Sequence, residues 1–196
     1  MQDIQLSPHF KLSELTASTT ARENGIDNTP PPEIVDNLSH LCEGTLEPLR
    51  EEIKLPVVIT SGYRCKALNE RITHHSATSQ HMSGCAADFY VGQGPASGFR
   101  CQVSGVKSQV SGHHLELETG ESPMKHETSS RRERLIKAFK TIILDERIEF
   151  DQLIIYPDFI HVSYVREGRK NRHKLTKADG RGDYRALTLE EALALV

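Results

Sequence analysis

The stretch Ser79-Gln-His-Met-Ser-Gly-Cys-Ala-Ala-Asp-Phe89 brings two potential metal ligands, His81 and Asp88, close together in the chain. Gly84 lies between them, and a glycine lets the backbone turn, so that the imidazole and the carboxylate can converge on one point. A lone carboxylate after two alanines is more often a turn or cap residue. The segment becomes informative only when a third ligand is found elsewhere.

A second short segment, Pro157-Asp-Phe-Ile-His-Val-Ser-Tyr164, supplies that ligand. His161 stands at the start of an apolar, β-branched run that predicts a strand. Asp158 precedes it by three residues, and an odd separation in an ideal strand points two side chains to opposite faces. Asp158 can therefore approach the same site only if it lies on a turn, which Pro157 makes plausible.

Two histidines and one carboxylate form a ligand set that zinc accepts in catalytic sites, which keep one position open for water. Zinc in such a site acidifies water and polarises a peptide carbonyl. A second carboxylate is then needed to carry protons, and Asp158 is the candidate. Arg64 offers a fixed positive charge for a developing oxyanion or a substrate carboxylate.

The rest of the chain predicts an α+β fold in a single domain over residues 1–196. Apolar residues recur at helical spacing over 30–53 and 131–147, a shorter helix is expected over 65–72, and Thr188 with Glu191 predicts a cap for a terminal helix. Strands are expected over 57–60, 152–156 and 160–165. The expected architecture is a small antiparallel sheet flanked by helices.

The composition excludes several classes of partner. The formal net charge of −3 offers no global basic field for nucleic acid. No segment reaches the length of a membrane span, and the first residues lack the basic and apolar regions of a signal peptide. We therefore expect synthesis in the cytoplasm, no nucleic-acid or membrane-spanning partner, and a monomer.

The composition of residues 92–130 shifts to Gly, Ser, Gln and charged residues. This predicts either a flexible insertion or a functional flap. The four cysteines, Cys42, Cys65, Cys85 and Cys101, contain no C-x-x-C pair and are interpreted as buried or partly buried thiols. The alternative is that Cys85 acts as a nucleophile, but its alternation with Ala87 favours burial in a strand. A thiol peptidase is therefore disfavoured.

The remaining polar residues near the site are not expected to bind metal or to act as nucleophiles. Ser79 and Ser83 flank His81 and are expected to form hydrogen bonds around it, because no Gly-x-Ser-x-Gly motif marks either as a nucleophile. Tyr63 is a further candidate for contacting the substrate or the site. Solvated surface positions are expected for the other histidines and for a basic cluster. These are His74, His75, His113, His114, His126, and Arg166, Arg169, Lys170, Arg172, His173 and Lys174.

Together, Ser79-x-His81-x-x-Gly84-x-Ala86-x-Asp88, the preceding Ser61-Gly-Tyr-Arg64 and the following Asp158-Phe-Ile-His161 resemble the zinc D-Ala-D-Ala carboxypeptidase family. That family includes the vancomycin-resistance D,D-dipeptidases and several phage endolysins, and it shares the hedgehog/D,D-peptidase fold. The resemblance covers residues 9–92 and 131–170. Many relatives have Glu where Asp158 stands, and the insertion is longer than expected.

The resemblance implies one Zn2+ held by His81, Asp88 and His161, with Asp158 as general acid and base and Arg64 as the arginine of the active site. It also implies a peptidoglycan substrate, cut by a carboxypeptidase or by an endolysin-type endopeptidase. Without a signal peptide, a phage or prophage enzyme released to the cell wall fits best. The alternative is a zinc-binding module that has lost catalysis and serves in recognition or assembly.

Overall fold

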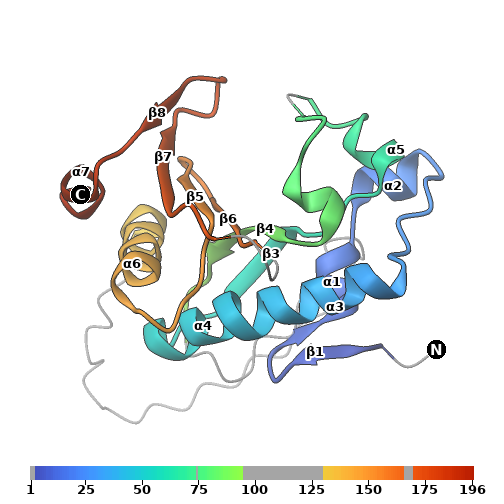
Figure 1. Ribbon diagram of the computed structural model, residues 1–196, viewed down its shortest axis with the longest axis horizontal. Helices are drawn as coiled ribbons and strands as arrows, with labels where there is room; N and C mark the ends of the chain where they lie inside the picture. Colours follow the sequence, from blue (N-terminus) through green and yellow to red (C-terminus); the bar gives the residue numbers. More distant parts are fainter. Residues whose placement is uncertain (1–2, 74, 95–129, 166–169) are drawn as a thin grey trace, which may run out of the picture.

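The computed structural model describes residues 3–73, 75–94, 130–165 and 170–196. Its helices and strands follow the chain in the order shown in Figure 1. The helical elements are α1 (Leu12–Thr16), α2 (Thr19–Glu23), α3 (Pro32–Leu41), η1 (Cys42–Leu46), α4 (Glu47–Ile53), α5 (Lys66–Asn69), η2 (Gln80–Ser83), α6 (Arg131–Leu144) and α7 (Leu189–Leu193). The strands are β1 (Gln5–Ser7), β2 (Phe10–Lys11), β3 (Val57–Ser61), β4 (Ala86–Val91), β5 (Gln152–Ile155), β6 (Ile160–Ser163), β7 (Lys174–Ala178) and β8 (Tyr184–Ala186).

The long helix expected after residue 30 is present as the continuous run α3, η1 and α4. Pro32 occupies its first turn, where a fixed φ favours helix entry and the missing N–H costs nothing. The segment η1 is π-helical, which shifts the register of the helix by part of a turn. One stripe of the run is buried, through Leu38, Leu46 and Ile53 among others.

The larger sheet has six strands in the order β3-β4-β6-β5-β7-β8. Its pairs are antiparallel except β5 and β7, which run parallel. The strands β1 and β2 form a separate two-stranded antiparallel sheet. The α+β class is confirmed, although the main sheet is larger than expected and contains a parallel pair.

The two faces of the larger sheet differ in chemistry because side chains alternate along each strand. One face carries apolar residues such as Phe89, Leu153 and Val162, which are fully buried with residues of α3, α4 and α6 in one hydrophobic core. The other face carries Asp88 of β4 and His161 of β6, which are direct partners in the pairing of these strands. The helices thus cover one face and leave the polar face available for a site.

Several elements escaped prediction from the sequence. These are β1, β2, α1 and α2 in the first 23 residues, and β7 and β8 near the end. Lys174 of the expected basic cluster begins β7, and Arg172 bonds to a buried carboxylate, so this segment is part of the fold as well as the surface. Arg166 and Arg169 lie outside the described residues, as does the stretch 95–129 of the expected insertion.

The described cysteines are free thiols: Cys42 and Cys85 are buried, and Cys65 is partly buried. Burial raises the pKa of the Cys42 thiol above its usual range. Cys101 lies outside the described residues. Among the helices described, none combines the length and the apolar character that crossing a bilayer requires.

Candidate metal centre

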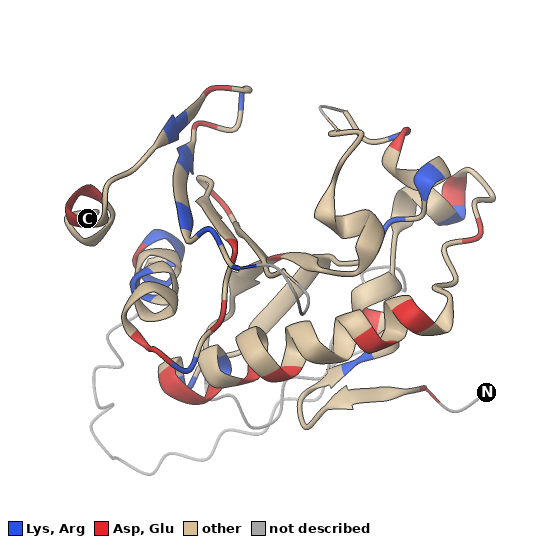
Figure 2. Cartoon of the chain, viewed as in Figure 1, with Lys and Arg blue, Asp and Glu red and all other residues tan. Residues whose placement is uncertain are grey.

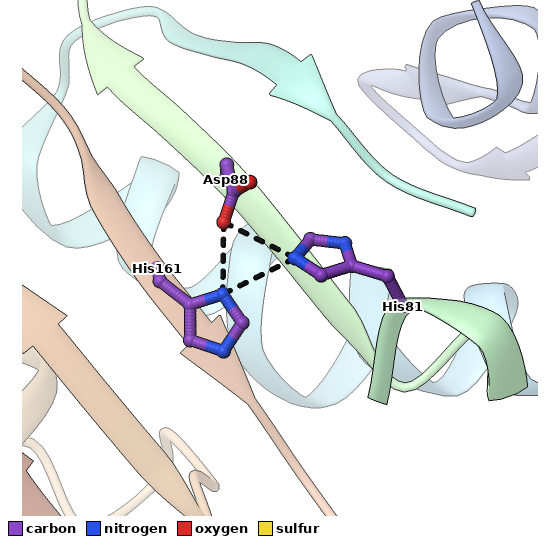
Figure 3. Close-up of side chains that lie close together, drawn as sticks. All are labelled: His81, Asp88 and His161. Atoms are coloured by element: carbon purple, nitrogen blue, oxygen red, sulfur yellow. Dashed lines mark hydrogen bonds and ion pairs between the residues drawn. The ribbon is translucent and has the colours of Figure 1, made fainter. Parts of the chain in front are cut away.

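Three side chains from distant parts of the chain converge at the polar face of the sheet (Figure 3). Nε2 of His81 lies 3.2 Å from Nδ1 of His161 and 3.3 Å from Oδ1 of Asp88. Nδ1 of His161 lies 2.8 Å from the same carboxylate oxygen. Among the described residues, this is the one group of His, Cys, Asp or Glu side chains whose ligand atoms meet closely enough to hold a metal ion.

His81 is held by a short turn of helix, η2, which ends at Gly84. Gly84 has a φ of +69°, and a Cβ there would lie 2.9 Å from the side chain and backbone of Ile34. A larger residue would therefore be strained and would also collide with α3. Asn37 of α3 donates a 2.7 Å hydrogen bond to the carbonyl of Ser83, which fastens η2 to the core helix.

The ring of His81 is fixed by a hydrogen bond on its other nitrogen. Nδ1 lies 2.7 Å from the carbonyl oxygen of Gly62, which can only accept, so Nδ1 carries the proton. Nε2 is then left with its lone pair facing His161 and Asp88. Metal-ligating histidines commonly have such a partner, which sets both tautomer and orientation.

Asp88 divides its two oxygens between the histidines and an arginine. Oδ1 faces His81 and His161, whereas Oδ2 accepts a 2.6 Å hydrogen bond from Arg64. Nε of Arg64 also donates to the hydroxyl of Ser61 at the end of β3, which holds the guanidinium in place. Arg64 thus lies beside the ligand carboxylate and orients it.

The protonation of these groups suits a metal site. Burial lowers the pKa of His81, which favours the neutral imidazole that can bind a metal. Burial alone would raise the pKa of Asp88, but the charges and hydrogen bonds of His81 and His161 outweigh it and hold the pKa below its usual range. The site therefore favours a neutral imidazole at His81 and an ionised carboxylate at Asp88.

The spacing of the three ligand atoms fits zinc. Ligands about 2.0–2.1 Å from a zinc ion at tetrahedral angles lie about 3.3–3.4 Å from one another. Two of the three observed separations, 3.2 and 3.3 Å, are close to this value, and the 2.8 Å between His161 and Asp88 is shorter. Three protein ligands leave the fourth position open, as in catalytic zinc sites.

Gln80, which precedes His81, ties this turn to the strand that carries His161. Its Nε2 donates to the carbonyl of Tyr164 at 3.1 Å, and its Oε1 accepts from the hydroxyl of Ser163 at 2.9 Å. Its Nε2 also lies 3.3 Å from a carboxylate oxygen of Asp151, which is fully buried. These bonds fix the distance between the two ligand histidines, a role that the sequence pattern did not reveal.

The three ligands open into a cleft of about 620 Å³. Arg64 and Ser79 line it, together with residues of the 72–80 segment and of β5, β7 and β8. Tyr156 is also in the lining, and its hydroxyl lies 3.2 Å from that of Tyr184. Neither tyrosine was expected from the sequence, although Tyr156 comes two residues after the cleft-lining Ile154, just beyond the end of β5.

The other residues that the sequence predicted for the site lie farther from the three candidate ligands or outside the described residues. Asp158 lies between β5 and β6, outside both strands, which is the condition set for its approach to the site, but its side chain is exposed and is not among the residues that line the cleft. Its backbone carbonyl accepts a 2.9 Å hydrogen bond from Arg131. Tyr63 is buried in the core, and His75 is exposed at the rim of the cleft. His74, His113, His114 and His126 lie outside the described residues.

Comparison with known families agrees with this geometry. Residues 8–115, more than half of the chain, match the model of a family described as peptidase M15. The chain belongs to the peptidase M15 family. The M15 peptidases are zinc-dependent, so membership indicates metallopeptidase activity and agrees with the His-Asp-His site. A search of curated proteins gave no match.

The matched part of this M15 chain contains Arg64, His81 and Asp88 but ends before His161. The fold places the third candidate ligand beside the other two: β6 pairs with β4, and His161 is the direct partner of Asp88. The matched range therefore covers two of the three candidate ligands, and the strand pairing places the third beside them.

Proposed function

We propose that this M15 protein hydrolyses amide bonds of peptidoglycan stem peptides, with zinc held by His81, Asp88 and His161. The observation that carries the proposal is the convergence of these three ligand atoms at a cleft, in a chain of a metallopeptidase family. The motifs around Arg64, His81 and His161 support the narrower resemblance to D-Ala-D-Ala carboxypeptidases and to endolysin-type endopeptidases.

Zinc bound in such a site lowers the pKa of a coordinated water and polarises the carbonyl of the bond to be cut. Nδ1–H of His81, bonded to Gly62, keeps Nε2 available as a ligand. Arg64 orients the carboxylate of Asp88 through its contact with Oδ2. Asp158 is proposed to accept a proton from the attacking water and to deliver it to the leaving amine.

A second candidate is a zinc-binding module without catalysis. The exposed position of Asp158, outside the cleft lining, is the observation that favours it. The two candidates share the metal site and differ only in turnover. One experiment on the intact chain therefore separates them.

The purified protein is loaded with zinc, its metal content is measured, and it is incubated with purified peptidoglycan whose fragments are identified by mass spectrometry. We expect one zinc per chain and new peptide termini, and the positions of those termini distinguish carboxypeptidase from endopeptidase action. His161→Ala, checked for folding by circular dichroism, is the control. A zinc-loaded protein that releases no new termini contradicts the peptidase and supports the binding module.

A further inference from the structure

Beyond the metal ligands, the polar face of the sheet continues across β5 and β7 toward Lys174. His161 of β6 is paired with Ile154 of β5. Ile154 is in turn paired with Thr176 of β7. Lys174 lies two residues along β7 from Thr176, on the same face, and is level with Gln152 of β5. Both Lys174 and Gln152 line the same cleft as the metal ligands.

The strand geometry gives the distance between the two ends of this face. Neighbouring strands lie about 4.8 Å apart and two residues along a strand span about 6.7 Å, so the backbones of His161 and Lys174 are separated by about 12 Å. An extended peptide advances about 3.4 Å per residue. A peptide crossing from the metal ligands toward β7 therefore reaches Lys174 after about three to four residues.

The cleft contains more positively charged than negatively charged side chains. Its described charged residues besides the histidines are Arg64, Asp88, Arg172 and Lys174. Arg64 is paired with Asp88, and Arg172 is paired with Asp151, a buried carboxylate behind the lining. Lys174 makes no ion pair with any residue that the structure describes, and the cleft is left with a surplus positive charge.

The position of this charge is set by the fold. Lys174 begins β7, whose basic residues stand out in Figure 2, and its backbone N–H donates a 2.9 Å hydrogen bond to the carbonyl of Asp151. Gln152 beside it has no hydrogen bond from its side chain within the described part of the chain, so its amide N–H groups are free to donate. A lysine and a glutamine amide side by side offer donors for one carboxylate.

We propose that Lys174, together with Gln152, binds a carboxylate of the peptide substrate about three to four residues from the cleaved bond. The inference rests on the proposed peptidase function and narrows its substrate class to peptides with an acidic group at that distance. In a stem peptide, the free α-carboxyl group of the glutamate residue is such a group. Its carboxamide form lacks the charge and would bind less tightly.

The test compares two synthetic stem peptides that differ only in this group, one with the free carboxylate and one with the carboxamide. Affinity for the zinc-loaded protein is measured by isothermal titration calorimetry, and turnover is followed separately by mass spectrometry. We expect the wild-type protein to bind the acid about tenfold more tightly than the amide, as for a charge-assisted hydrogen bond in a partly exposed site. Lys174→Met should abolish this preference.

Lys177→Met is the matched control. Lys177 lies on the same strand, is also exposed, and is three residues away, so that it points to the opposite face and does not line the cleft. It should keep the full preference for the acid. Both variants remove one positive charge, so the comparison separates a local contact from the overall charge of the protein.

Equal affinity of the wild-type protein for the two peptides, or a preference that survives in Lys174→Met, overturns the role of Lys174. Cleavage of neither peptide contradicts the peptidase function, whereas the affinities still decide the charge preference. Cleavage of both peptides at equal efficiency and with equal affinity leaves the peptidase standing and refutes the acidic subsite. Failure to bind either peptide contradicts both proposals.

Discussion

The imidazole of His81 donates a hydrogen bond of 2.7 Å to the backbone carbonyl of Gly62, across nineteen positions of the chain. The direction of the Gly62 carbonyl is set in turn by the close approach of the backbone at Gly62 to the backbone of Leu15. The next residue, Tyr63, donates its N–H to the carbonyl of Leu15 at 2.6 Å. The metal centre is thus oriented by the packing of α1 against the end of β3.

Gly62→Ala should weaken zinc binding. A Cβ at this position would lie 2.2 Å from the carbonyl oxygen of Leu15, a backbone atom that cannot move aside as a flexible side chain can. The backbone must shift, which turns the Gly62 carbonyl away from His81. We expect zinc affinity to fall about 10–100-fold, as for loss of other partners of metal-bound histidines, measured by competition with a chromogenic chelator.

Gly44→Ala is the control for that substitution. A Cβ on Gly44 meets no atom within 4 Å, and the residue lies within the long helical run, where alanine is favoured over glycine. This variant should bind zinc as the wild type does and should not be less stable. If Gly62→Ala binds zinc equally well, the carbonyl of Gly62 does not orient the ligand.

Arg64→Met should also weaken zinc binding, because Oδ2 of Asp88 loses its 2.6 Å hydrogen bond and the carboxylate can rotate. We expect a loss of about tenfold or more in zinc affinity. Arg64→Lys should restore part of it, since an ammonium replaces the charge but cannot bridge Ser61 and Asp88 as the guanidinium does. Unchanged zinc affinity together with a fall in kcat would instead assign Arg64 to the substrate.

Asp158→Asn tests the proton carrier. If Asp158 transfers protons in the reaction, this near-isosteric change should reduce kcat by about 10²–10⁴-fold while zinc content and folding stay as in the wild type. Because Asp158 is exposed on its turn, little change in stability is expected. Full activity of the variant would show that another group carries the proton, and loss of zinc would show that Asp158 contacts the metal.

The three candidate ligands could be picked out from the sequence because zinc binds a few residue types, and because Gly84 and the strand around His161 indicate how those residues meet. Asp158 lies on a turn, which its odd spacing to His161 made a condition for approaching the site, but its side chain is outside the cleft lining. The carbonyl of Gly62 could not be predicted, since any residue has a carbonyl and only packing aims it. The strand that begins at Lys174 was hidden because its charged residues resemble a solvated surface, and its pairing with β5 bridges a long separation in sequence.

Asp151→Asn should destabilise the fold. Asp151 is fully buried and accepts hydrogen bonds from the guanidinium and backbone N–H of Arg172 and from Gln80. Because an amide replaces one acceptor oxygen with a donor and removes the charge, we expect a loss of about 2 kcal/mol in the free energy of unfolding at pH 7. Asp36→Asn, at an exposed position of α3, should change it by less than about 0.5 kcal/mol.

The dependence of this effect on pH follows from the pKa of Asp151. Burial acts to raise that pKa, but the hydrogen bonds and charge of Arg172 outweigh it and lower the pKa in the folded protein. A lowered pKa contributes stability above the unfolded value of about 3.9, and this is lost as the pH falls through the folded value. Urea unfolding should therefore show a constant difference between wild type and Asp151→Asn from pH 7 to pH 5, narrowing only below about pH 4. A difference that already narrows between pH 7 and pH 5 would mean that the carboxylate is not held ionised by Arg172.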